Sequence, residues 1–415
     1  MKVQLKCLVL VSLSVLPAVG YGQELGSLTV AEALALARDY NPDLRAARQE
    51  LEVAQSRLLK ARYSSPFNPT LGSEIANRSR GERGEHGNSV DFAVMLSQEI
   101  EVAGQRSKRI DEADRNLAVV TQRVRDRERL ILAQVKDSFY RALSQRRRFL
   151  LFRQVEDLNR RLRDVAAARF QAGEVSKLEV NLAEIQLGQA RRDGLTAERD
   201  YHNTLRELER LVGQEPSGTV GLTGQLTVSP QTFDGQALIR VALEKRPDLQ
   251  AVRAERGRLD AETTLVRRMI IPNPTLGFVY REEERRDRIA GAVLSVPLPV
   301  FDRKQAELRQ LAARRDQTSY EQQSVELQVR QEVGDALRAY NTAKAEVEVY
   351  EQAVLERATE NFQLIEAAYR EGQINLLQLV VVQTNLLNAQ LSYFDALASY
   401  WQARTALERA TGTDL

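Results

Sequence analysis

The chain has 415 residues, one cysteine, two histidines and a formal charge of +2 at neutral pH. The two excess positive charges are Lys2 and Lys6, so the rest of the chain is balanced and has no basic surplus that would favour nucleic acid. The one cysteine, Cys7, lies close to the start, and the remaining chain therefore offers no disulfide, zinc–thiolate site or cysteine nucleophile.

Residues 1–22 have the pattern of a secretory signal peptide. A lysine-containing start precedes a short apolar run and small residues, and cleavage is expected before Gln23. The apolar run is too short to span a bilayer as a stable helix. Cys7 follows a lysine rather than the small residues at the end of a signal, so no lipid-attachment site is predicted.

The rest of the chain consists of two sequence repeats of one structural unit. Residues 68–72, Asn-Pro-Thr-Leu-Gly, recur as 273–277 at an offset of 205. Further along, 208–213 match 407–412 at an offset of 199, so the second copy is six residues shorter between these anchors. We assign this loss to the polar stretch 79–88. A duplication of this period predicts two copies of one supersecondary unit.

Each copy reads, in chain order, as a short helix, a proline break, a medium helix, a two-strand hairpin, a very long helix, a glycine turn and a return helix. The copies are 23–213 and 234–415, joined by a linker at 214–233 that is rich in Gly, Pro, Ser and Thr. The expected elements are medium helices at 42–64 and 247–269, hairpins at about 68–99 and 273–299, long helices at about 103–171 and 302–370, and return helices at about 175–213 and 374–412.

The long helices show a heptad seam. Two stretches of the chain contain no proline, and apolar residues within them fall alternately three and four apart, as in Val329, Val333, Ala336, Tyr340 and Ala343. This spacing is typical of helices packed along their length with a coiled-coil twist. At a rise of about 1.5 Å per residue, each long helix spans roughly 100 Å and each return helix roughly 60 Å. We expect a tall layer of near-parallel rods.

The hairpin strands alternate apolar and mixed residues at period two. The apolar set, predicted to face lipid, is Val90, Phe92, Val94, Leu96, Leu276, Phe278 and Tyr280. One such hairpin alone fits an ordinary soluble protein equally well, but two copies behind a signal peptide favour membrane β-strands. Four strands are too few to close a membrane barrel, so several chains would have to contribute. The predicted fold class is mainly α with a small β part.

The residue inventory does not support an enzyme. His86 lies in a Gly-rich hairpin loop and His202 on a return helix, and no Gly-rich phosphate loop follows a strand. Carboxylates alternate with Lys and Arg, as on solvated helix surfaces. Met95 and Met269 are the only methionines after the first residue, too few for a soft-metal site. We predict no catalytic site, no cofactor and no metal site.

The duplicated pattern resembles the TolC-type outer-membrane efflux family over essentially the whole chain after the signal. The most telling matches are Pro42-Asp43-Leu44, Asn68-Pro69-Thr70-Leu71, the turn glycines Gly173 and Gly372, and the run Leu294-Ser295-Val296-Pro297-Leu298-Pro299-Val300-Phe301-Asp302-Arg303. That last run, with Gln98–Arg106 in the first copy, looks like the branch serving heavy-metal efflux pumps of the cobalt-zinc-cadmium or copper-silver type.

The resemblance implies a homotrimer with a 12-strand barrel in the outer membrane and a helical tunnel in the periplasm. It also implies two partners, a periplasmic adaptor protein and an inner-membrane pump of the resistance-nodulation-division type. The helix turns would form the tunnel mouth that meets the adaptor, and the residues concerned are Gly173, Val175, Ser176, Leu178, Gly372, Ile374, Asn375 and Leu377.

The chain departs from the family at the tunnel constriction. In the TolC protein two acidic residues narrow the tunnel, and the matching positions here are Gln378 and Val381. Glu179, at the equivalent place in the first copy, supplies one carboxylate per chain. The candidate constriction residues are therefore Glu179, Gln378 and Val381.

Two functions of different class follow from these observations. One is a passive exit duct, for heavy-metal cations or alternatively for drugs or secreted proteins. The other is a periplasmic coiled-coil scaffold without a pore. The hairpins separate these two readings, because a scaffold has no need for apolar alternation in both duplicated strand pairs.

Overall fold

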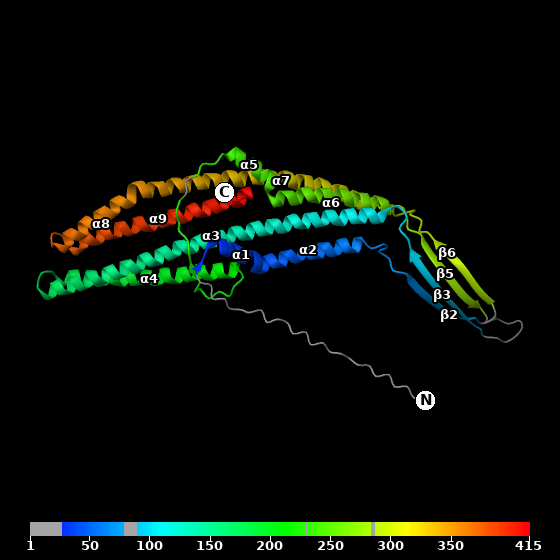
Figure 1. Cartoon of the computed structure of the whole chain (residues 1–415), viewed down its shortest axis with the longest axis horizontal. Coiled ribbons are helices and arrows are strands. Elements are labelled where there is room, and N and C mark those ends of the chain that lie inside the picture. The colour runs from blue at the N-terminus through cyan, green and yellow to red at the C-terminus, as the bar shows by residue number, and fades with distance from the viewer. Residues whose placement is uncertain (1–26, 79–88, 229–230, 284–286) are drawn as a thin grey trace, which may run out of the picture.

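The computed structural model describes residues 27–78, 89–228, 231–283 and 287–415. The described chain is a long rod with four strands at one end, two helical tips at the other and near-parallel helices between them (Figure 1). This mainly helical architecture with a small sheet confirms the coarse fold class predicted from the sequence. The predicted signal peptide, the hairpin loop at 79–88 and His86 lie outside the described residues.

The two repeats contain corresponding elements in the same order. The first repeat consists of α1 (Val30–Tyr40), α2 (Pro42–Ala61), β2 (Thr70–Arg78), β3 (Ser89–Glu99), α3 (Gln105–Gln171) and α4 (Lys177–Leu211). The second consists of α5 (Gly235–Lys245), α6 (Pro247–Met269), β5 (Thr275–Glu283), β6 (Asp287–Ser295), α7 (Gln305–Val349), η1 (Tyr350–Val354), α8 (Leu355–Arg370) and α9 (Leu376–Thr411). Two short strands, β1 (Ser27–Leu28) and β4 (Gly221–Leu222), pair in parallel and join the linker to the residues just before α1.

Helix starts follow from local sequence. Thr29 and Glu32 form a reciprocal capping box at α1, in which each side chain bonds the other residue's backbone N–H. Asn41 caps α2 through Leu44 N, and Pro42 occupies the first helical position, where its missing N–H costs nothing. The proline breaks predicted from the sequence are therefore helix boundaries.

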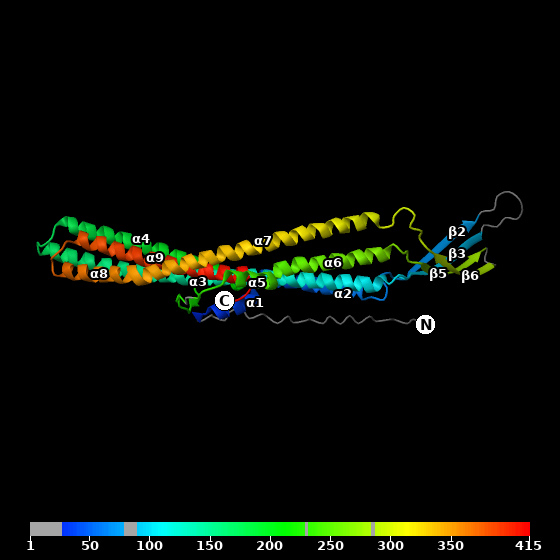
Figure 2. The ribbon, with the colours of Figure 1, turned by 90° about the horizontal axis from the view of Figure 1, so that it is seen from above.

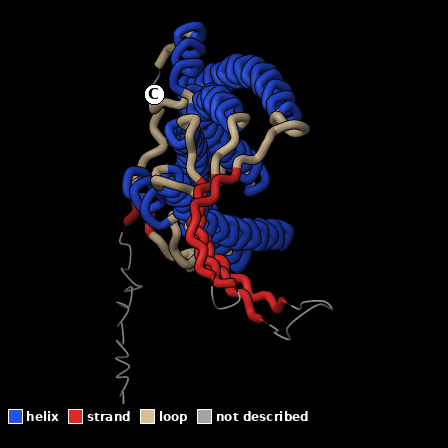
Figure 3. Tube along the Cα trace, turned by 90° about the vertical axis from the view of Figure 1, so that its right-hand side faces the viewer, coloured by secondary structure: helices blue, strands red, loops and turns tan. Residues whose placement is uncertain are grey.

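The four strands form one antiparallel sheet in the order β2-β3-β5-β6. The central pairing joins the repeats, with Leu96 opposite Phe278 and Val94 opposite Tyr280. The outer edges of β2 and β6 have no strand partner within the described sheet. Figure 3, which looks along the rod from the strand end, shows the sheet twisting away from the helices.

The main hydrophobic core lies midway along the rod, where the short helices and the linker wrap the long helices. Phe139 of α3, Tyr340 of α7 and Tyr400 of α9 are almost fully buried there. Tyr140 stacks on Trp401, with ring centroids 4.1 Å apart. The heptad seam of α7 is buried from Val329 to Val347, so the seam predicted from the sequence is the packed face of that helix.

The six-residue difference between the repeats is spread over three places, which corrects our assignment of it to one loop. Thr70 pairs with Ser97, but Thr275 pairs with Ser295, so the second hairpin is seven residues shorter. The segment from the paired serine to the start of the long helix, Ser97 to Gln105 and Ser295 to Gln305, is two residues longer in the second repeat. The helical arm that follows is one residue shorter. The pairing of the strands shows each length difference separately. The matched sequence motifs give only their net total of six residues.

The second long helix, predicted as one continuous helix at about 302–370, is interrupted in the structure. The π-helical turn η1 separates α7 from α8, and α8 bends relative to α7 (Figure 1). Tyr393 of α9 donates a hydrogen bond to Glu351 within η1 at 2.8 Å. A wide turn of this kind is a recognised cause of helix bending. Beyond it the packed residues are Phe362, Ile365 and Tyr369, one residue later than the alternating spacing through Tyr350 would place them. That single extra residue is the only trace of the turn in the apolar pattern, and we did not predict it.

Lys304 marks the strained end of the longer connection. It has φ +61°, the one left-handed backbone at a non-glycine residue in the described chain, and its counterpart in the first repeat is Gly104 with φ +72°. Its backbone N–H donates to Asp302 Oδ1 at 2.8 Å, and its side chain makes surface ion pairs to Asp302 and Glu307, which contribute little.

We expect Lys304→Gly to stabilise the protein by about 1 kcal/mol, because glycine adopts this backbone without steric cost. Thermal unfolding followed by circular dichroism measures the change. Gly104→Lys is the matched control and should destabilise by a similar amount. A lower midpoint for Lys304→Gly would contradict this explanation.

Candidate functional site

The two predicted helix turns lie side by side at the end of the rod opposite the strands (Figures 1 and 2). Gly173 has φ +79° and Gly372 has φ +72°. In each turn the amide that follows the glycine reaches back five residues along the chain, from Glu174 N to Arg169 O and from Gln373 N to Ala368 O. These are the helix-ending bonds that a left-handed glycine permits, so both glycines are required by the turn itself.

Contacts between α3, α4 and α8 join the two turns. The Arg169 guanidinium donates to the carbonyl oxygens of Tyr369 and Arg370 at 3.3 and 3.2 Å and lies over the Tyr369 ring. The Tyr369 hydroxyl donates to Glu179 Oε1 at 3.4 Å. Burial and the nearby Glu179 carboxylate raise the pKa of Tyr369, so the hydroxyl remains a donor at neutral pH. We did not predict this bridge, because the sequence does not show that α3 and α8 meet here.

The predicted docking residues differ in exposure. Leu178 is 77% exposed and Leu377 is 57% exposed, although both are apolar. Ser176 and Asn375 are also exposed, but Asn375 forms a capping box with Gln378 and therefore has a structural role. Val175 and Ile374 are half-buried, and Ile374 packs on the small core that holds Tyr369. Folding of the single chain gives no reason for Leu178 and Leu377 to be exposed, so these two side chains are the candidates for contact with a partner.

The three candidate constriction residues do not form one set in the single chain. Glu179 is half-buried and accepts the bond from Tyr369. Gln378 accepts the Asn375 amide through its side-chain oxygen at 3.2 Å, so it serves the helix cap. Val381 is 54% exposed on α9.

The seven apolar strand residues lie on one face of the sheet. Directly paired residues point to the same side, and the pairs Leu96–Phe278, Val94–Tyr280 and Gln98–Leu276 put the apolar positions of β3 and β5 together. Leu71 and Ile75 of β2 and Leu294 of β6 join the same face through their own pairings. The opposite face carries mainly small and polar residues. This segregation is what a sheet with lipid on one side and water on the other requires.

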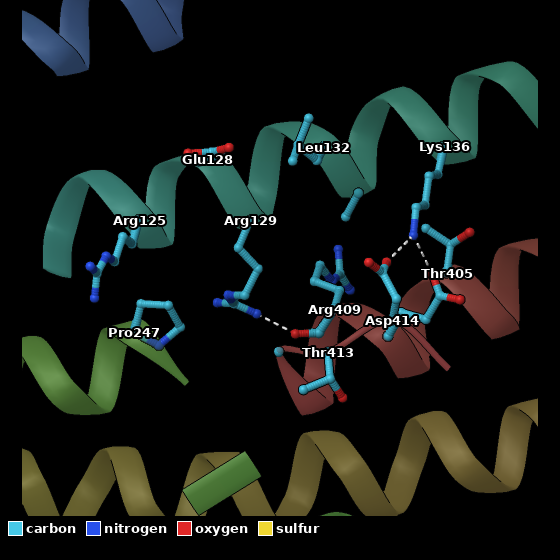
Figure 4. Close-up of a pocket in the computed structure, with 13 residues that line it drawn as sticks. Arg125, Glu128, Arg129, Leu132, Lys136, Pro247, Thr405, Arg409, Thr413 and Asp414 are labelled. Atoms are coloured by element: carbon cyan, nitrogen blue, oxygen red, sulfur yellow. Dashed lines mark hydrogen bonds and ion pairs between the residues drawn. The ribbon is translucent and has the colours of Figure 1, made fainter. Parts of the chain in front are cut away.

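A charged cleft lies between α3, the start of α6 and the end of α9 (Figure 4). Its Lys136 bonds Glu408 at 2.7 Å and Asp414 at 2.5 Å, while Arg129 bonds the Arg409 carbonyl. Burial alone would lower the pKa of Lys136, but these carboxylates outweigh it and the pKa lies above the ordinary value. These charges therefore neutralise one another and hold α3 against the end of α9.

Within the described ranges, no three His, Cys, Asp or Glu side chains gather closely enough to hold a metal ion. Of the helices that the structure describes, none is both long and apolar enough to cross a membrane.

Both repeats match one protein family, described as outer membrane efflux protein, over residues 33–214 and 238–413. The chain is 26% identical over 388 residues to the cobalt-zinc-cadmium resistance protein CzcC of Cupriavidus metallidurans, covering 93% of this chain and 90% of that protein. The CmeC outer membrane channel of Campylobacter jejuni has the same fold, with a TM-score of 0.77 at 16% identity over 95% of this chain and 90% of CmeC. CusC, whose crystal structures concern folding and transmembrane channel formation, has a TM-score of 0.75 at 16% identity over 96% of both chains.

The family match spans both halves of the chain, and the two solved structures align with 95% or more of it. The scaffold without a pore is thereby set aside, and so is any enzyme. This chain belongs to the outer membrane efflux protein family, whose members are non-enzymatic transport channels of the Gram-negative outer membrane with a helical part in the periplasm.

Proposed function

We propose that three copies of this chain form the exit duct of a tripartite efflux system that passes heavy-metal cations from the periplasm to the cell exterior. The observation that carries the metal assignment is the near full-length alignment with a cobalt-zinc-cadmium resistance protein. The run 294–303, already distinctive in the sequence, supports the same branch of the family.

Assembly into a duct follows from the free edges of the chain. The β2 and β6 edges present unpaired N–H and C=O groups, and lipid cannot satisfy them. The helices at the same two sides of the rod carry exposed apolar side chains, among them Val53 and Leu59 on α2, and Tyr320 and Leu327 on α7. A ring of three copies would pair every edge and give a 12-strand barrel.

Selection of the cation is assigned to the partners rather than to this chain. Metal ions that bind tightly need clustered thiolate, imidazole or carboxylate ligands, and the described residues hold no such cluster. We therefore assign recognition to an inner-membrane pump of the resistance-nodulation-division type and its periplasmic adaptor, with this chain as an unselective conduit whose tips meet the adaptor.

The function is tested in a cell that has lost its own outer-membrane component of a metal efflux pump. Expression of this chain together with its pump and adaptor should restore growth in zinc, cadmium or cobalt and lower cellular metal. Drug resistance and secretion of a reporter protein are measured in the same strains. Restored drug resistance or secretion with no change in metal tolerance would overturn the metal assignment.

The lipid-facing assignment makes a prediction about two neighbouring strand residues. Phe278→Arg puts a charge on the apolar face and should cost about 2–4 kcal/mol near the bilayer centre, which would block membrane assembly. Val279→Arg, on the opposite face, should assemble normally. Outer-membrane fractionation of the two variants gives the answer, and equal assembly of both would show that the faces are assigned wrongly.

A further inference from the structure

A polar clamp joins the two repeats where strands become helices. Gln105, the first residue of α3, is only 2% exposed, and its Nε2 donates to Asn273 Oδ1 at 2.9 Å. Asn273 in turn donates to Glu99 Oε1 at 2.9 Å, and Ile100 N donates to Pro274 O at 2.9 Å. The first repeat thus holds the Asn-Pro motif of the second, directly beside the β3–β5 pairing.

The residues of this clamp are duplicated, and their copies lie at the two free sides of the chain. Asn68 corresponds to Asn273 and stands before the edge strand β2, while Gln305 corresponds to Gln105 and begins the edge helix α7. Both copies are exposed. Gln305 repeats the local turn of Gln105, since its Oε1 accepts Arg303 N at 2.7 Å where Gln105 Oε1 accepts Ala103 N at 2.8 Å.

The geometry points to a second clamp between copies of the chain, and this inference rests on the ring assembly proposed above. We propose that Gln305 of one protomer donates to Asn68 of the next, as Gln105 donates to Asn273 within each protomer. The recurring Asn-Pro-Thr-Leu-Gly motif would then be the joining element of a ring with six similar junctions, three within protomers and three between them.

The internal junction also fixes a strand register for the external one. Leu96 lies opposite Phe278 in the β3–β5 pairing. The hairpin pairings make Leu294 the counterpart of Leu96, and Ser73 is the counterpart of Phe278. Leu294 of one protomer should therefore lie opposite Ser73 of the next, and Pro297 takes the position of Glu99.

The external clamp is not an identical copy, because proline cannot replace the Glu99 carboxylate as an acceptor. The longer connection supplies apolar surface instead. Leu298 is 79% exposed and Phe301 is 91% exposed. Both belong to the connection between the edge strand β6 and the edge helix α7, and they line a hollow that Glu99 and Gln105 also line. We expect contact with the next protomer to cover them.

Disulfide trapping tests the register in the assembled full-length protein. Ser73→Cys combined with Leu294→Cys should give covalently linked trimers on mild oxidation, since opposed residues lie about 5 Å apart and the mature chain has no other cysteine. The two sites cannot bond within one chain because β3 and β5 separate them. Ile75→Cys with Leu294→Cys is the out-of-register control and should remain unlinked. Linked trimers from the control pair but not from the Ser73 pair would overturn the proposal, and so would the absence of any link in a particle of three copies. A particle that is not trimeric would instead refute the duct.

Substitution of Asn68 tests the clamp itself. Asn68→Ala should lower the temperature at which trimers dissociate while leaving the helix content of the chain unchanged, whereas Asn68→Asp keeps the acceptor oxygen and should retain most of the trimer stability. Asn273→Ala, which breaks the internal clamp, is the matched control and should lower the stability of each protomer. An unchanged dissociation temperature for Asn68→Ala would rule out a contribution from this bond.

Discussion

Gly213→Ala is expected to abolish folding of the central region and remove the protein from the outer membrane. Gly213 ends α4 with φ +78°, and a Cβ atom there would lie 2.3 Å from Tyr40 O and 2.5 Å from Tyr40 C. Both atoms belong to the backbone at the end of α1, so no side chain can move aside. Backbone strain and the clash together should cost at least about 3 kcal/mol.

Two equivalent substitutions separate the clash from the strain. Gly412 is the counterpart of Gly213, with φ +73° and a nearest contact of 3.4 Å to the Arg246 side chain, while Gly173 has φ +79° and no atom within 4 Å. Alanine at either position should cost about 1–2 kcal/mol, from strain alone. The amount of folded protein in the membrane and its unfolding midpoint rank the three variants. Gly213→Ala behaving like Gly173→Ala would contradict the close contact with Tyr40.

Leu178→Arg combined with Leu377→Arg is expected to abolish export while the protein still folds, assembles and reaches the membrane. Both leucines are exposed on the first turns of α4 and α9, at the far end of the rod, where water would otherwise favour polar groups. If this end is the docking surface, two charges per protomer would enter an apolar contact, and burying them unpaired would prevent binding of the adaptor.

The leucine positions give a cleaner test than the adjacent helix caps. Asn375→Arg would remove the α9 capping box at a cost of about 1 kcal/mol, which mixes stability with docking. Leu150→Arg, at an exposed position on α3 away from the tips, controls for added charge. Metal tolerance, adaptor crosslinking and trimer mass are measured for each variant. Full tolerance in the double variant would show that the adaptor does not bind here.

Much of the fold could be predicted because its patterns repeat over many residues. The absence of proline and the three–four apolar spacing predict the long helices, and period-two alternation predicts strands whose apolar residues share a face. The Asn-Pro-Thr-Leu-Gly motif marks the hairpin starts in both repeats. These signals are local and redundant, so one atypical residue does not obscure them.

The features that the sequence did not reveal depend on single residues or on contacts between distant segments. The π-helical turn at Tyr350–Val354 shows in the sequence as no more than one extra residue in the apolar spacing. Position 41 is an asparagine that bonds Leu211 O, and its counterpart Arg246 bonds Ala410 O and pairs with Asp248 and Glu332. The same structural task is done by unrelated side chains, which only the spatial arrangement shows.

Assembly of three chains into one duct is tested by the mass of the native particle. The protein is extracted from outer membranes in a mild detergent and measured by native mass spectrometry, with bound detergent removed in the gas phase. We expect three copies of the chain in one particle, because a closed ring pairs the β2 and β6 edges. A particle of one chain, stable and correctly located in the outer membrane, would contradict it.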